Sequence, residues 1–161
     1  MDIKEIGGCA VLVIGGVTYG IASGGLKDAL DSDIRLVTEV AYEDRAEYMD
    51  DVVDQFTAAF ETYIVQTETY DYVGYSEFSA TPWNATFVET VTSEERIPNQ
   101  EMSAILRQTK VGFCAQEEMT MFTDKGWSYD FSMFDGAGRA IGRISCTPDR
   151  SKFPANHNAI G

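Results

Sequence analysis

Histidine is almost absent from the chain, since His157 is the single one among 161 residues. A Ser–His or Cys–His nucleophile pair would have to use it, and no surrounding motif frames it for that role. Zinc sites need clustered cysteine and histidine ligands, and the three cysteines show no CxxC spacing. We therefore expect no catalytic residues, no metal site and no cofactor, and the protein is not predicted to be an enzyme.

Basic residues are also scarce. Twelve lysines and arginines stand against 26 acidic residues, so the net charge is −14. Such a surface repels phosphate backbones and anionic lipid headgroups, which argues against a nucleic-acid partner. Residues 28–77 hold 14 of the acidic residues against Arg35 and Arg45. We interpret this as a solvated helix face, with a basic partner or a cation site as the alternative.

Charge of either sign is missing from residues 6–26. A helix of that length spans about 31 Å, close to the thickness of a bilayer's hydrocarbon core. We therefore predict a single transmembrane helix here. Small-xxx-small strips let neighbouring helices approach closely in lipid. One such strip lies on a single face of the predicted helix and marks its expected packing residues, Gly8, Gly16, Gly20 and Gly24.

Two other interpretations of this segment stay open. Residues 9–14 and 17–21 are rich in β-branched side chains, and Gly15-Gly16 between them suits a two-residue turn. This pattern favours a buried β-hairpin. A cleaved signal peptide, ending near residues 22–24, is the other alternative.

The remaining chain predicts helices and strands in one α+β domain. Residues 43–64 carry one apolar stripe at helical spacing, which predicts an amphipathic helix with these residues in the core: Met49, Val52, Val53, Phe56, Phe60 and Tyr63. A short helix is expected over 98–109 and a strand over 85–91.

The last third of the chain has the strongest strand signals. Strands are expected over 110–114, 119–122, 127–134 and 139–146, with turns at 123–126 and 135–138. Residues 127–134 alternate between apolar and polar side chains, as one buried and one wet sheet face require. We therefore predict an antiparallel β-meander covered by the helix at 43–64.

Two cysteines lie in strand-like stretches of this last third. We predict a disulfide between Cys114 and Cys146, whereas Cys9 belongs to the apolar segment. Disulfides persist in oxidising compartments. The pair therefore indicates that the domain is extracytoplasmic, in the periplasm, although two unpaired buried thiols are the alternative.

These features divide the chain into an anchor over 1–26, an acidic α+β domain over 27–146 and an irregular arm over 147–161. They predict a non-catalytic, single-span accessory or assembly subunit of a larger membrane complex. Its N-terminal helix would contact the lipid bilayer and other membrane protein subunits.

The outline also resembles type IV pilins, which have an apolar N-terminal helix, an amphipathic helix, an antiparallel sheet and a late cysteine pair. Glu5 stands where mature pilins carry a glutamate, whereas Asp2 and Lys4 depart from the pilin pattern. The resemblance implies a self-assembling filament subunit, and a virion structural subunit would share the anchored domain. A third hypothesis is a soluble domain with a buried N-terminal hairpin.

Overall fold

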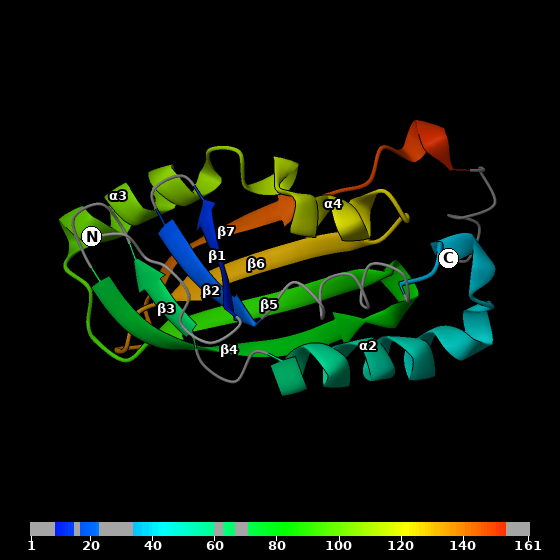
Figure 1. The fold of residues 1–161 in the computed structure, drawn as a ribbon, viewed down its shortest axis with the longest axis horizontal. Coiled ribbons are helices and arrows are strands. Elements are labelled where there is room, and N and C mark those ends of the chain that lie inside the picture. The colour runs from blue at the N-terminus through cyan, green and yellow to red at the C-terminus, as the bar shows by residue number, and fades with distance from the viewer. Residues whose placement is uncertain (1–8, 15–16, 23–33, 60–62, 67–70, 154–161) are drawn as a thin grey trace.

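A computed structural model describes residues 9–14, 17–22, 34–59, 63–66 and 71–153 of the protein. Within these ranges the fold is α+β, with helices packed on a mixed sheet (Figure 1). The predicted fold class is therefore confirmed at that level.

The central sheet consists of β4 (Asp71–Thr81), β5 (Thr86–Ser93), β6 (Ser128–Phe134) and β7 (Ala140–Cys146), in that order. β4 and β5 pair antiparallel, as do β6 and β7, but β5 and β6 pair parallel. The predicted all-antiparallel meander is therefore wrong. Parallel neighbours need a long crossover connection, and 34 residues, 94–127, separate β5 from β6.

That crossover contains α3 (Asn99–Lys110), the 3-10 turn η4 (Phe113–Ala115) and α4 (Glu117–Thr123). The helix expected over 98–109 is thus confirmed. The strands expected over 110–114 and 119–122 are wrong, because these short apolar runs form a helix end, a turn and a helix. Periodicity alone does not separate a short buried helix from a strand.

The amphipathic helix is α2 (Arg45–Ala59), which ends earlier than predicted, and Tyr63–Gln66 forms strand β3 instead. Three residues of its apolar stripe, Met49, Val52 and Phe56, are buried. α2 lies along β4, while α3 and α4 lie along β7 and β6 (Figure 1).

The core between helices and sheet is mainly aromatic. Phe87 of β5 is fully buried, and its ring centroid lies 4.8 Å from that of Phe56 on α2 and 5.0 Å from that of Phe122 on α4. Tyr129 of β6 stacks on the same ring at 5.3 Å. Rings from two central strands and two helices therefore meet on one face of the sheet, and burial of that much aromatic surface is a major stabilising contribution.

The described parts of the predicted membrane helix are strands. β1 (Cys9–Ile14) and β2 (Val17–Ala22) pair antiparallel, and β3 connects them to β4, so the sheet has seven strands in chain order. This is the hairpin alternative, favoured by the β-branched residues on both sides of Gly15-Gly16. None of the described helices is long and apolar enough to cross a bilayer.

The described part of the arm, residues 147–153, contains the short 3-10 turn η5 (Arg150–Lys152). Asp149 caps this turn by accepting a hydrogen bond from the Ser151 backbone N–H at 3.1 Å. Residues 154–161, which include His157, lie outside the described residues.

Candidate interaction surface

Within the described residues, the helices lie on one face of the central sheet, and the side chains of the other face are exposed or half-buried. Along β4, side chains at alternate positions are exposed to solvent: Val73, Tyr75, Glu77, Ser79 and Thr81. Their neighbours in between, from Tyr72 to Ala80, point into the core side. Since successive strand residues point to opposite faces, this alternation marks the solvent-exposed side of β4.

The same surface continues over the neighbouring strands. β5 and β6 contribute the half-buried residues Thr86, Val88, Thr90, Thr92, Ser128, Asp130 and Ser132, and β7 contributes the exposed Arg143 and Ser145. We call these positions together with those of β4 the open face. The polar side of residues 127–134 was predicted from their alternation and is confirmed, but its extension over β4 and β5 depends on the strand order.

Most side chains of the open face are small hydroxyls, and few are charged. Arg143 donates to the carboxylate of Asp130 in an ion pair, which leaves Glu77 as the remaining charged side chain. The outer face of α2 differs sharply, because its exposed side chains include the acidic Glu47, Asp50, Asp51 and Asp54. Interface centres are generally poor in charged residues and rich in tyrosine. The open face shares the low charge and exposes one tyrosine, Tyr75, but it is rich in serine, which interfaces generally lack.

The covered face of the sheet holds one buried carboxylate. Glu89 of β5 accepts hydrogen bonds from the hydroxyl of Tyr129 and, at 2.9 Å, from Ser76 Oγ. Both donors come from adjacent strands of the same sheet. Such bonds offset the cost of burying a polar group, so this cluster ties β4, β5 and β6 together inside the core.

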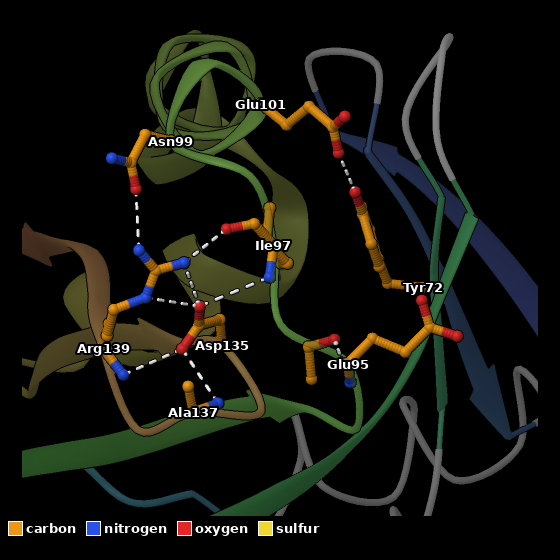
Figure 2. Close-up of polar contacts among 9 residues, drawn as sticks. Tyr72, Glu95, Ile97, Asn99, Glu101, Asp135, Ala137 and Arg139 are labelled. Carbon is orange, nitrogen blue, oxygen red and sulfur yellow. Dashed lines mark hydrogen bonds and ion pairs between the residues drawn. The ribbon is translucent and has the colours of Figure 1, made fainter.

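The turn between β6 and β7 is fastened to the start of the crossover by a second buried acid (Figure 2). Asp135 is fully buried and accepts hydrogen bonds from the backbone N–H groups of Ala137, Arg139 and Ile97 at 3.0, 2.9 and 3.3 Å. The Arg139 guanidinium also donates to it, and to Asn99 Oδ1 at 2.7 Å.

These contacts determine the ionisation of Asp135. Burial raises the pKa of its carboxyl, but the hydrogen bonds from the Arg139 side chain and from the backbone N–H groups of Arg139 and Ala137 outweigh burial and lower the pKa to about 2. Asp135 is therefore ionised at neutral pH and acts as a structural clamp. The predicted turn at 135–138 is confirmed, but the sequence did not predict the clamp.

A small apolar cavity lies beneath α3, next to the hydrogen bond between Tyr72 and Glu101 shown in Figure 2. Its volume is about 20 Å³, and Ile97, Ile105 and Met133 line it together with β4 and β5 residues. Ligand pockets usually measure about 300–1,000 Å³. The cavity therefore offers room for a water-sized group rather than for a substrate.

The predicted disulfide is present. Cys114 of η4 and Cys146 at the end of β7 are bonded, with their Cα atoms 5.3 Å apart. Cys114 is exposed, whereas Cys146 is buried. The bond therefore joins the middle of the crossover, between α3 and α4, to the last residue of the edge strand.

The predicted packing glycines do not form a described site. Gly20 lies in β2, opposite Val11 of β1, whereas Gly8, Gly16 and Gly24 lie outside the described residues. Within the ranges given above, no group of three or more histidine, cysteine or acidic side chains is arranged to hold a metal ion.

Comparison of the chain with protein-family models, curated proteins and solved structures finds no match.

Proposed function

We propose that this protein is a non-catalytic accessory or assembly subunit that binds a protein partner through the open face. The single observation that carries the proposal is the contrast between this face and the rest of a chain with net charge −14. A four-stranded surface with hydroxyl side chains, exposed Val73 and Tyr75 and few charges is suited to contact with another protein.

The disulfide supports an oxidising compartment as the place of this function. Cys114 and Cys146 are bonded, and such bonds persist where the environment is oxidising. We therefore propose that the domain works on the extracytoplasmic side of a membrane, in the periplasm if the source is a bacterium.

Site-specific photo-crosslinking tests the binding surface. Thr90 lies at the centre of the open face and would be replaced by a photoreactive phenylalanine analogue; Asp50, exposed on α2, would be replaced in a matched control. After irradiation in cells, mass spectrometry should identify one defined cross-linked protein from Thr90 and none from Asp50. Absence of any cross-link from Thr90 would contradict the proposal.

A second proposal concerns residues 6–26. Their lack of charge supports a membrane anchor, with Gly8, Gly16, Gly20 and Gly24 contacting other membrane subunits, whereas the paired strands β1 and β2 support a hairpin in the sheet. Alkaline carbonate extraction of membranes separates the two. An anchored protein stays in the pellet. Recovery in the supernatant would contradict the membrane anchor and also a pilin-like filament built on an N-terminal helix.

A further inference from the structure

We infer that the partner at the open face is a second copy of this chain, packed face to face about a two-fold axis parallel to the strands. This inference rests on the proposed function and deepens it by naming the partner. It is carried by the placement of the charged residues along one row of the sheet.

The row runs straight across four strands. Glu77 of β4 pairs with Thr90 of β5, Thr90 pairs with Ser132 of β6, and Ser132 pairs with Arg143 of β7. Neighbouring strands lie about 4.8 Å apart, so the acid and the base are separated by about 14 Å. The row therefore has a negative end, a neutral centre with two hydroxyls and a positive end.

A two-fold axis that runs parallel to the strands, midway between β5 and β6, exchanges the two ends of this row. It places Glu77 of each copy opposite Arg143 of the other, so two ion pairs form at once, as an isologous interface requires. A two-fold axis that runs across the strands, along this row, would place each acid opposite its own counterpart and each base opposite its own. The charges thus favour one of the two orientations.

The remaining side chains permit this approach. Thr90 and Ser132 are short, so two sheets can pack about 10 Å apart, a gap that the long side chains of glutamate and arginine bridge. Asp130 already holds Arg143 in an intramolecular ion pair, which orients its guanidinium before association. The arginine would then lie between two carboxylates, one from each copy.

The size of the face predicts a weak and reversible dimer. Four strands of about seven residues give a surface of roughly 15 by 23 Å, about 350 Å² of flat area per copy. Standard stable interfaces bury about 800 Å² per partner, so the complex belongs with the small, transient class. The net charge of −14 also opposes association, and dimerisation should depend on protein concentration and ionic strength.

Charge exchange tests the inference on the purified full chain. Sedimentation equilibrium would measure the dimer dissociation constant for the wild type, Glu77→Arg, Arg143→Glu and the double variant. Each single reversal creates two like-charge contacts and should raise the dissociation constant about tenfold or more. The double variant should recover most but not all of this loss, because Arg143→Glu also places a carboxylate beside Asp130. Thermal unfolding by circular dichroism would verify that each variant is folded.

Matched controls change the same charge elsewhere. Glu47→Arg on α2 and Lys110→Glu at the end of α3 alter the net charge as the two test variants do, at exposed positions outside the open face. Both should leave the dissociation constant within about threefold. Glu77→Arg makes the chain less acidic, so weaker association in this variant is opposite to what net charge alone predicts.

The inference is overturned if the wild type stays monomeric at millimolar concentration or if the double variant does not recover association. These outcomes are distinct from failure of the proposed function. A cross-link from Thr90 to a different protein, with a monomeric purified chain, would leave the open face as an interface and exclude the homodimer. Absence of any cross-link from Thr90, together with a monomeric chain, would exclude both.

Discussion

Reduction of the disulfide is expected to destabilise the protein by an amount set by the loop it closes. Cys114 and Cys146 are 32 positions apart. In the chain-entropy treatment a 15-residue loop contributes about 3 kcal/mol and a 100-residue loop about 4.7 kcal/mol, so this bond should contribute about 3 to 4 kcal/mol. For a domain of this size, such a loss lowers Tm by about 6 to 16 °C.

Urea unfolding with and without a phosphine reductant measures this loss. Trp127 is buried in the core, so its fluorescence reports the transition. The midpoint should fall on reduction, and the slope with urea should rise, because the unfolded chain without the cross-link exposes more surface. Cys114→Ser replaces an exposed side chain and should reproduce the reduced protein without further change on addition of reductant.

The result that would refute this reasoning is equal stability of the oxidised and reduced proteins to within about 0.5 kcal/mol. A second refutation comes from thiol labelling. If both Cys114 and Cys146 react with an alkylating reagent in the unfolded, unreduced protein, the two sulfurs are not bonded.

Three further predictions concern the core and the turn between β6 and β7. Phe87→Ala should lower the free energy of unfolding by about 3 to 5 kcal/mol in urea titrations because Phe87 is fully buried among aromatic rings, whereas Val88→Ala on the open face should cost less than about 1.5 kcal/mol. Because the pKa of Asp135 is lowered to about 2, its contribution to stability should be complete above about pH 4 and should be lost as the pH falls towards 2. The difference in free energy of unfolding between wild type and Asp135→Asn should therefore shrink over that range. A difference that stays constant would contradict the lowered pKa. Gly136→Ala should lower Tm, because a Cβ there would overlap the backbone carbonyl of Glu94, and a Tm equal to that of the wild type would show that the turn can shift.

Local features of the fold were predictable from the sequence because they depend on neighbouring residues. The apolar stripe of α2 and the alternation of residues 127–134 each reflect burial of one face of a single element. The turn at 135–138 follows from its glycines. The disulfide prediction is correct although one of the two strands it assumed, 110–114, is a helix end and a turn.

The order of the strands was not predictable in the same way. The parallel pairing of β5 with β6 brings together residues about 40 positions apart, as for Phe87 and Tyr129, and no local pattern encodes that choice. The open face forms only when β4, β5, β6 and β7 lie side by side. The candidate site therefore could not be predicted from the sequence. The clamp of Asp135 and Arg139 was hidden as well, because one of its partners is the distant backbone of Ile97.

β7 is held at both of its ends, by the Asp135 clamp and by the disulfide, and this limits how the strand can separate from the sheet. The Asp135 clamp holds the beginning of this edge strand to residues 95–99, and the disulfide holds its end to η4. An edge strand is normally the first to fray and the first to recruit foreign strands. Here the strand cannot peel away without carrying the whole α3–η4 connection with it, so in hydrogen exchange its amides should open together with those of α3. Reduction of the disulfide alone should let β7 fray from the Cys146 end. This would expose a new sheet edge while the turn at Asp135 stays closed.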